Sequence, residues 1–359
     1  MSCYLRPVAF VDSPFDLDGK VARLAGGLCW FSAVEILVMD GARRESIALV
    51  PVDRIDEALA RHGDAAATAW RNLTAPRPPL SLGARTVRLD QPQAVGILNV
   101  TPDSFSDDGH FGDEEAAANA GFFMAEAGAA IVDVGGESTR PGAKPVWERD
   151  EIDRAIPVVR RLAAGGTAVS IDTRKAAVME AALAAGASMV NDVSALTYDD
   201  RSAEIAAAAS CPIVLMHHKG APETMQKAPH YERPVLHEIY DWLAERIEAA
   251  AAAGIARDRI LVDPGFGFGK NVQHNLQLMN DLALLHGLGC PIMLGASRKR
   301  TIGALSGEAP PDRRLAGSLA FALKAAEQGV QLLRVHDVPE TVQALRIWRG
   351  LRDAALTAG

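Results

Sequence analysis

Short apolar runs recur at regular intervals from residue 94 onward. They are AVGIL (94–98), AIVDVG (130–135), AVSID (168–172), SMVND (188–192), PIVLMH (212–217), RILVDP (259–264), PIMLG (291–295) and VQLLRVH (330–336). Nearly continuous apolar runs are typical of strands buried on both faces of a parallel sheet. Helix-like segments rich in Ala, Leu and Glu separate most of them, as in 234–253. Eight strands alternating with helices over roughly 260 residues predict an α/β fold, a (β/α)₈ TIM barrel. An open, doubly wound sheet is the competing architecture.

The first 78 residues follow a different pattern. Residues 4–12, 34–41 and 46–54 look like strands, residues 55–73 look like a helix, and TAPRPPL then reads as a linker. Next, LSLGARTVRLD alternates apolar and polar residues about a Gly-Ala turn, which predicts a β-hairpin that plugs the bottom of the barrel. We therefore expect a small α+β extension over 1–78, of unknown role and without catalytic residues, and a barrel domain over 79–355.

Composition and charge narrow the class of protein. Apolar residues make up 48% of the 359 residues and charged residues 23%, which is typical of a soluble globular protein. The net charge of −8 argues against a nucleic-acid binder but not against an anionic substrate. The four cysteines form no CxxC pair, and no apolar stretch is long enough to span a bilayer. These features predict a cytoplasmic protein with reduced thiols and no membrane association.

Polar side chains stand at the carboxyl end of every predicted strand. In chain order they are Asn99, Glu137, Asp172, Asn191, His217, Asp263, Ser297 with Lys299, and Arg334 with His336. In a barrel these ends converge on one rim, where such enzymes keep their chemistry. The sequence therefore predicts the site at this rim.

Two groups of these side chains indicate what the site binds. Arg334 and His336 are alternate residues of a strand and point the same way, so with Arg140 they could clamp an anion with two or three charges. Asp172, Asn191 and Asp263 offer acceptors that suit a flat heterocycle with several N–H groups. The DPGFGFGKN segment after that strand matches neither the P-loop nor the dinucleotide fingerprint. A local cap before Pro264 is the simpler interpretation of Asp263.

Eight motifs together resemble one family. NVTPDSFSDDG, DVGGESTRPGA, IDTRK, NDVSAL, LMHHKG, DPGFGFGKN, SRKR-TIG and RVHDVPET, in this order, closely resemble the dihydropteroate synthases of folate biosynthesis over residues 79 to about 350. The resemblance implies a barrel enzyme, a transferase that joins (7,8-dihydropterin-6-yl)methyl diphosphate to 4-aminobenzoate and releases pyrophosphate. It also implies Mg²⁺ as cofactor, a homodimer and a sulfonamide target.

The resemblance also implies a role for each site residue. The pterin subsite would comprise Asp172, Asn191, Met216, Asp263, Phe268, Gly295 and Lys299. The diphosphate would meet Asn99, Thr139, Arg140, Arg334 and His336, with Mg²⁺ coordinated through Asn99. The 4-aminobenzoate would lie against Phe105, Pro141, Phe268, Ser297 and Lys299. Asp107, Arg140 and Lys299 would be the catalytic residues, and the loop after Asn99 would act as a lid.

Two alternatives keep the pterin but change the function. One is a methyltetrahydrofolate-binding domain of a corrinoid methyltransferase, and the other is a catalytically silent pterin-binding module. A silent module would be expected to lose some of the residues Asn99, Arg140, Lys299, Arg334 and His336, yet all five are present. Three positions depart from the commonest family pattern, namely Arg174, His218 and Arg300. We expect these three to add positive charge near the rim.

Overall fold

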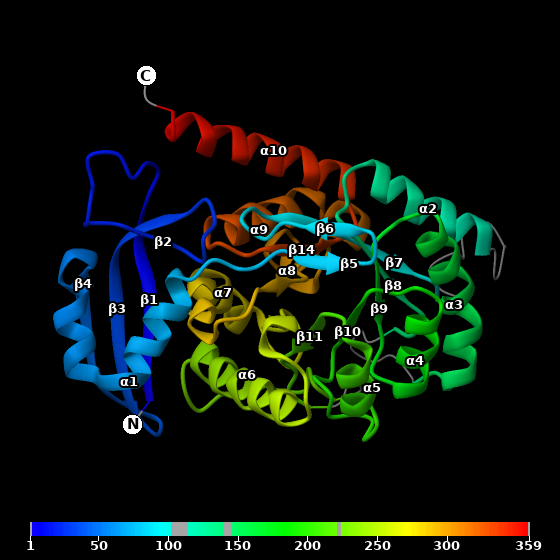
Figure 1. The fold of residues 1–359 in the computed structure, drawn as a ribbon, viewed down its shortest axis with the longest axis horizontal. Helices are drawn as coiled ribbons and strands as arrows, with labels where there is room; N and C mark the ends of the chain where they lie inside the picture. Colours follow the sequence, from blue (N-terminus) through cyan, green and yellow to red (C-terminus); the bar gives the residue numbers. More distant parts are fainter. Residues whose placement is uncertain (1, 102–113, 139–144, 221–223, 358–359) are drawn as a thin grey trace.

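The computed structural model describes residues 2–101, 114–138, 145–220 and 224–357. Figure 1 shows an eight-stranded barrel with helices around it, and a smaller sheet at its side that is built by the first residues of the chain. None of the helices in these ranges is both long and apolar enough to cross a membrane.

The barrel strands are parallel and follow one another in chain order. They are β7 (Gln93–Asn99), β8 (Ile131–Gly135), β9 (Val169–Asp172), β10 (Met189–Asp192), β11 (Ile213–Met216), β12 (Ile260–Asp263), β13 (Met293–Leu294) and β14 (Leu332–Val335). β14 pairs with β7, and the bridge between Val262 and Ile292 joins β12 to the segment that leads into β13. The sheet is therefore closed, so the predicted barrel is confirmed and the open sheet is excluded.

Helices cover the outer face of this sheet (Figure 1). They are α2 (Glu114–Glu126), α3 (Glu148–Ala164), α4 (Ala176–Ala184), α5 (Ser202–Ala209), α6 (Val235–Ala252), α7 (Val272–Asp281), α8 (Arg300–Leu305), α9 (Leu315–Glu327) and α10 (Val338–Ala355), with 3₁₀ turns η3 (Arg257–Arg259), η4 (Leu282–Leu288) and η5 (Pro311–Arg313). The predicted helix at 234–253 matches α6. Gly254 follows its end with φ of 95°, a conformation that favours glycine.

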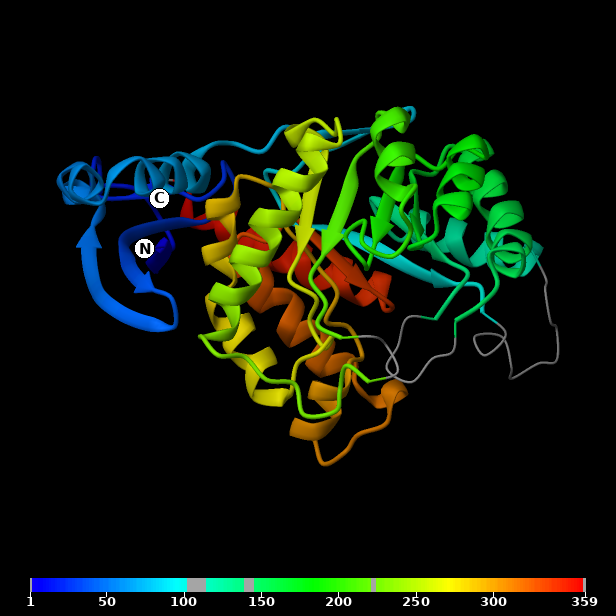
Figure 2. The ribbon, with the colours of Figure 1, turned by 90° about the horizontal axis from the view of Figure 1, so that it is seen from below.

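The bottom of the barrel is closed by the predicted hairpin, β5 (Leu80–Leu82) and β6 (Arg85–Val87). Figure 2 shows this segment, in cyan, at one end of the barrel. Leu80, Leu82 and Val87 of the hairpin and Leu89 just after it pack in a buried layer with Val95, Ile131, Met189, Val214, Leu261, Met293 and Leu332 of the barrel strands and with Ala168, which directly precedes β9. These eight barrel residues mark the inner face of the sheet.

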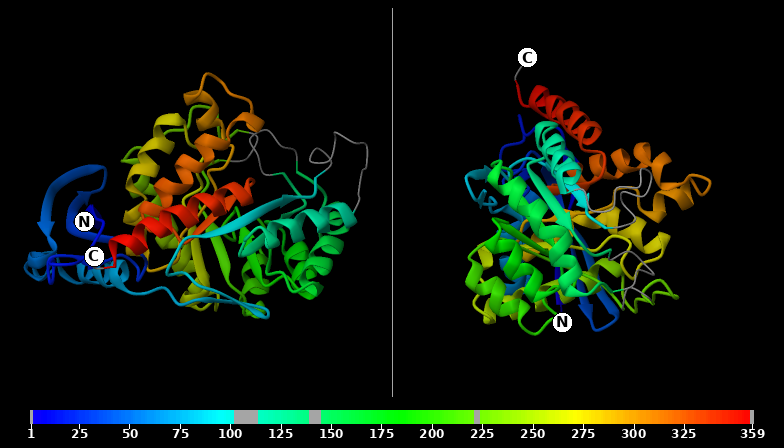
Figure 3. Two further views of the ribbon diagram at one scale, coloured as in Figure 1. Left: turned by 90° about the horizontal axis from the view of Figure 1, so that it is seen from above. Right: turned by 90° about the vertical axis from the view of Figure 1, so that its right-hand side faces the viewer.

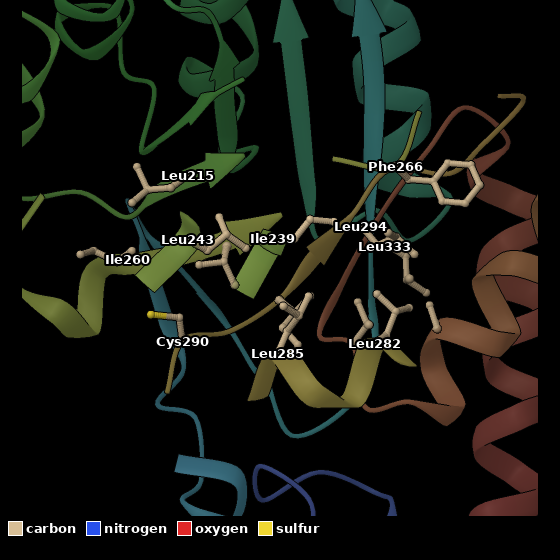
Figure 4. Packing of buried hydrophobic residues seen from close by; sticks show 14 of the residues in the cluster. Leu215, Ile239, Leu243, Ile260, Phe266, Leu282, Leu285, Cys290, Leu294 and Leu333 are labelled. Carbon is tan, nitrogen blue, oxygen red and sulfur yellow. The ribbon is translucent and has the colours of Figure 1, made fainter. Parts of the chain in front are cut away.

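The outer face of the sheet has its own apolar core. In Figure 4, Ile239 and Leu243 of α6 and Leu282 and Leu285 of η4 pack near Leu215, Ile260, Leu294 and Leu333 of the strands. All these side chains are almost completely buried. This core fixes the strands and thus the positions of the side chains at their ends.

The extension is an antiparallel sheet and a helix, as predicted. Its elements are β1 (Ser2–Val11), β2 (Ala22–Arg23), β3 (Trp30–Asp40), β4 (Arg43–Pro51), η1 (Val52–Arg54) and α1 (Ile55–Thr74). Tyr4 donates a hydrogen bond to Asp241 of α6 at 2.8 Å, and Arg352 of α10 donates to the carbonyl oxygen of Val11 at 3.1 Å. Figure 3 shows α10, in red, reaching from the barrel to the blue extension. Buried residues of the extension, such as Phe31, belong to the outer core of the barrel.

Candidate active site

Seven of the predicted site residues share one geometric property, which is an even sequence separation from a residue of the inner apolar layer. Asn191, Met216, Asp263, Gly295 and Arg334 each come two residues after a member of that layer, and Asn99 and Asp172 come four residues after one. Side chains two residues apart on a strand point to the same side. All seven residues therefore face the inside of the barrel, above the hairpin.

Arg334 is the centre of a buried charge cluster. Its Nε donates to Asp133 Oδ2 at 2.5 Å, and its Nη2 donates to Asp172 Oδ2 at 2.6 Å. Burial raises the pKa of Asp172 to about 7, although the charge of Arg334 acts in the opposite direction. Within the described ranges, Asp172 Oδ1 is buried and has no hydrogen-bond partner. A buried oxygen without a hydrogen-bond donor lowers the stability of the fold. We therefore expect a bound ligand to donate a hydrogen bond to Asp172 Oδ1.

Asp263 lies at the end of β12 and is only 4% exposed. Its Oδ1 accepts a hydrogen bond from the backbone N–H of Gly265 at 2.7 Å, so one oxygen does act as the local cap. Burial raises the pKa of this carboxyl, against the influence of that N–H and of Lys299. A buried carboxylate with a single local bond retains acceptor capacity for a ligand.

The segment after Asp263 is held by a buried lysine. Lys270 Nζ donates to the carbonyl oxygens of Gly265 and Phe268, at 2.9 and 3.1 Å, and lies 2.9 Å from His217 Nδ1. Gly265 has φ of 67°, and a Cβ on it would stand 1.8 Å from the carbonyl oxygen of His217. Glycine is therefore required at 265, and the sequence motif reflects a tight turn rather than a phosphate loop.

Lys299 and Phe268 form a pair at the mouth of the barrel. The ammonium of Lys299 lies 4.0 Å from the ring centroid of Phe268, and its Nζ donates to the carbonyl oxygen of Phe266 at 2.5 Å. Both side chains are partly exposed. The pair offers a flat apolar surface with a positive charge beside it.

Ser297 connects β13 to the segment after β14. Its Oγ accepts from the backbone N–H of His336 at 3.2 Å and lies 3.1 Å from His336 Nδ1. Gly295 lies against Arg334, since a Cβ on it would be 3.8 Å from Arg334 Cβ. Val335 packs in the outer core, so Arg334 points inward as the alternation predicted.

Asn99 and Asp172 meet over Gly135. A Cβ on Gly135 would lie 3.5 Å from Asn99 Oδ1 and 3.7 Å from Asp172 Oδ2. The absence of that Cβ leaves a small space between an amide oxygen and a carboxylate. Both are oxygen ligands of the kind that Mg²⁺ prefers.

Five predicted site residues lie outside the residues that the structure describes. They are Phe105, Asp107, Thr139, Arg140 and Pro141. Residues 102–112, which make up most of the expected lid, also lie outside the described ranges. The described residues on either side of 139–144 are linked, because Glu137 Oε1 accepts from the backbone N–H of Val146 at 2.9 Å.

Two positions that depart from the family pattern do not add positive charge, contrary to our expectation. Arg174 is buried and paired with Glu137, with Nε 3.1 Å from Oε2. Burial lowers the pKa of His218, which favours its neutral form. Only Arg300 is exposed. Arg174 and His218 therefore add little positive charge, because the first is paired and the second is desolvated.

The sequence did not single out Asp133, which binds Arg334. It also did not single out Glu151, which lies 2.5 Å from Lys175 and shares this lysine with the predicted Glu137 at 3.2 Å. The sequence does contain one indication of Asp133, because it is a charged residue within the otherwise apolar strand AIVDVG. Burying such a charge requires a partner, and a partner distant in sequence cannot be identified from the run itself.

An open cleft of about 750 Å³ lies elsewhere, between the Gly41–Ala42 turn of the extension and residues 219–245. Its lining mixes basic and acidic side chains, and none of the strand-end residues named above lines it. We place the site at the rim because the buried acceptors are there. Among the described residues, no three His, Cys, Asp or Glu side chains form a metal-binding group.

Known proteins give an independent comparison. A sequence family described as pterin binding enzyme matches residues 95–336. Dihydropteroate synthase of Escherichia coli is 46% identical over 260 residues, which cover 72% of this chain and 91% of that protein. Two crystal structures cover 77% of this chain, each with a TM-score of 0.73. The Xanthomonas albilineans dihydropteroate synthase with 4-aminobenzoic acid is 48% identical and 98% covered, and the Yersinia pestis enzyme with a sulfonamide drug is 45% identical and 99% covered.

The rim described above combines buried acceptors, a buried guanidinium and an aromatic ring beside a lysine on one barrel. The chain belongs to the pterin binding enzyme family, among the dihydropteroate synthases.

Proposed function

We propose that the rim of the barrel performs the dihydropteroate synthase reaction with the residues described above. The amine nitrogen of 4-aminobenzoate attacks the methylene carbon of (7,8-dihydropterin-6-yl)methyl diphosphate. The C–N bond forms, the C–O bond to diphosphate breaks, and the amine loses a proton. The products are 7,8-dihydropteroate and pyrophosphate. The observation that carries the proposal is the buried acceptor Asp172 Oδ1 next to a guanidinium in the barrel.

The pterin binds deepest, against Asp172, Asn191 and Asp263. These side chains are 8%, 3% and 4% exposed, so water competes little for them. A carboxylate that accepts two N–H bonds from the ring stabilises the complex by about 3–6 kcal/mol, at about 1.5–3 kcal/mol each. Met216, Phe268, Gly295 and Lys299 complete the subsite around the ring.

The diphosphate lies nearer the mouth, on Arg334 and His336, with Thr139 and Arg140 from the second loop. The guanidinium of Arg334 lies inside the barrel, where ion pairs with Asp133 and Asp172 hold it. A leaving diphosphate needs its growing charge neutralised, and fixed guanidinium groups do so in a water-poor site.

Magnesium fits the same place through Asn99. Asn99, whose Oδ1 borders the small space over Gly135, would hold the ion, and an amide oxygen is a ligand of the kind that Mg²⁺ takes. When bound, Mg²⁺ neutralises the leaving diphosphate. Asn99 orients its amide oxygen toward this space.

The 4-aminobenzoate enters last, beside Phe268, Ser297 and Lys299, with Phe105 and Pro141 supplied by the two loops. Lys299 is one charge available to the carboxylate of this substrate. An arylamine is unprotonated at neutral pH, so the attack needs no strong base. Asp107 and Arg140 complete the catalytic set, with Asp107 stabilising positive charge on the methylene carbon. We also propose that two copies form a homodimer, which light scattering would test.

The experiment that tests the function is direct. The purified chain is given both substrates and Mg²⁺, and pyrophosphate release is followed with a coupled assay. We expect release that needs both substrates and that falls when Mg²⁺ is chelated. No release above the rate without enzyme would refute the function. Equal release without 4-aminobenzoate would show hydrolysis instead of condensation.

A further inference from the structure

The roles assigned above include no function for Asp133, a buried carboxylate of the barrel. Asp133 is the middle residue of β8 and is 1% exposed. Ile131 belongs to the inner apolar layer, whereas Val132 and Val134 belong to the outer core. Side chains alternate along a strand, so Asp133 points into the barrel. It lies directly above the apolar layer, at the floor of the site.

Asp133 accepts two hydrogen bonds on one oxygen from opposite sides of the barrel. Arg334 Nε, on β14, donates to Oδ2 at 2.5 Å, and Asn191 Nδ2, on β10, donates to the same oxygen at 3.0 Å. In the strand order β10-β9-β8-β7-β14, β8 is the midpoint, so each donor comes from two strands away. Neighbouring strands are about 4.8 Å apart, so this one carboxylate links side chains across the interior.

Packing alone does not account for an aspartate here. A charge buried at this depth is costly unless it is paired, and apolar side chains often fill such places without loss of stability. Both partners of Asp133 are side chains that we assign to the substrate. We propose that Asp133 is a positioning residue of the reaction, which holds Arg334 and Asn191 in the orientation that meets the pterin substrate. This inference rests on the proposed site.

Asp133 also affects how strongly the guanidinium of Arg334 interacts with Asp172. Arg334 bridges two carboxylates, with Nε on Asp133 and Nη2 on Asp172 at 2.6 Å. Without the charge of Asp133, the guanidinium has Asp172 as its one remaining hydrogen-bonded carboxylate among the described residues. It then competes with the ligand for an oxygen of Asp172. Asn191 also loses the acceptor that fixes which way its amide faces. The expected consequence is a weaker pterin complex, with smaller effects on the second substrate.

The test is Asp133→Asn with Asp192→Asn as the matched control. Asp192 is also a fully buried strand aspartate, but it accepts only local bonds, from Ser194 N, Ser194 Oγ and Leu196 N at 2.7–2.8 Å. For Asp133→Asn we expect the KM for the dihydropterin diphosphate to rise about 10-fold or more, and the KM for 4-aminobenzoate to change less than about 3-fold. For Asp192→Asn we expect a lower melting temperature, with both KM values within about 3-fold.

A double variant separates positioning from packing. In the Arg334→Met background, Asp133 keeps Asn191 as a partner but has lost its charged partner. Asp133→Asn should then reduce the affinity for the pterin substrate by a smaller factor than it does in the wild type, and should raise the melting temperature by removing a buried carboxylate that has no cation beside it. Effects of the two substitutions that simply add would contradict the inference.

The remaining outcomes are also decisive. An unchanged KM for the pterin substrate in Asp133→Asn overturns the inference. If Asp133→Asn does not fold, Asp133→Ser is measured in its place. If neither variant folds while Asp192→Asn does, Asp133 is required for folding and the inference is overturned. Asp263→Asn is measured alongside. If it binds pterin normally, the proposed site is wrong, whereas if it alone is impaired, only the role of Asp133 is wrong.

Discussion

The two ends of the barrel interior differ in chemistry although the same strands build both. At the bottom, Ile131, Leu261 and Leu332 pack against the hairpin in a purely apolar layer. Two residues later, the same inner faces carry Asp133, Asp263 and Arg334. The change from apolar to charged side chains occurs within about 7 Å of strand, at about 3.3 Å per residue. The bottom layer stabilises the barrel, and the layer above it holds the charged residues to which we assign the ligand.

Arg334→Met should produce the largest change, because it removes the shared partner of two buried carboxylates. It also removes a guanidinium that we assign to the diphosphate, and the loss of two charge-assisted bonds to that group, at about 1.5–3 kcal/mol each, predicts a fall in kcat/KM of roughly 10²–10⁴-fold. Steady-state kinetics would measure it. Arg298→Met is the matched control, because Arg298 pairs with Asp337 at 3.0 Å near the surface. A comparable fall in kcat/KM for Arg298→Met would mean that the effect does not depend on the location of the arginine inside the barrel.

Leu82→Ala tests the opposite end. Leu82 is 1% exposed in the apolar layer, and truncation of such a leucine costs about 2–5 kcal/mol of unfolding free energy. Urea unfolding would measure this loss. We expect the KM for both substrates to stay within about 2-fold at temperatures where the variant is folded. Weakened pterin binding with little loss of unfolding free energy would contradict the assignment of the apolar layer to stability alone.

Gly135→Ala should produce a smaller, local effect at the rim. The added methyl group would make ordinary contacts of 3.5–3.7 Å with Asn99 and Asp172, so the fold should tolerate it. It fills the space assigned to the metal and diphosphate, so the KM for the dihydropterin diphosphate should rise about 10-fold, which corresponds to 1.4 kcal/mol. Gly350→Ala, which has nothing within 4 Å of its new Cβ, is the control. Equal kinetics in the two variants would remove Gly135 from the site.

The pH dependence of stability tests the same charged layer without kinetics. Burial raises the pKa of Asp172 from 3.8 to about 7, so the folded state binds a proton there more tightly than the unfolded state does. The stability that this provides is present at acid pH and is lost as the pH rises from about 4 through 7. Compared with Asp172→Asn, the wild-type chain should therefore lose unfolding free energy between pH 5 and pH 8. Parallel pH curves for the two proteins would contradict the assigned pKa.

Most of the barrel could be predicted from the sequence, because its signals are local. Apolar runs and the hairpin pattern depend on neighbouring residues, and the alternation along β14 placed Arg334 inside. The pairing of Arg334 with Asp133 could not be predicted, because closure of the barrel brings together residues 201 positions apart. The same reason hid the contact of Tyr4 with Asp241, which lies 237 positions away. The roles of Phe105, Asp107 and Arg140 stay predictions.

The central claim is that pterin binding depends on the charged layer and not on the apolar layer beneath it. Titration calorimetry of a dihydropterin into the wild type, Asp263→Asn and Leu82→Ala tests it most directly. Asp263→Asn replaces an acceptor with a group that also presents N–H, so we expect its affinity to fall about 10²-fold or more, from about 3 kcal/mol of lost hydrogen bonding. Leu82→Ala should bind as the wild type does. Unchanged affinity in Asp263→Asn, or an equal loss in both variants, would contradict the claim.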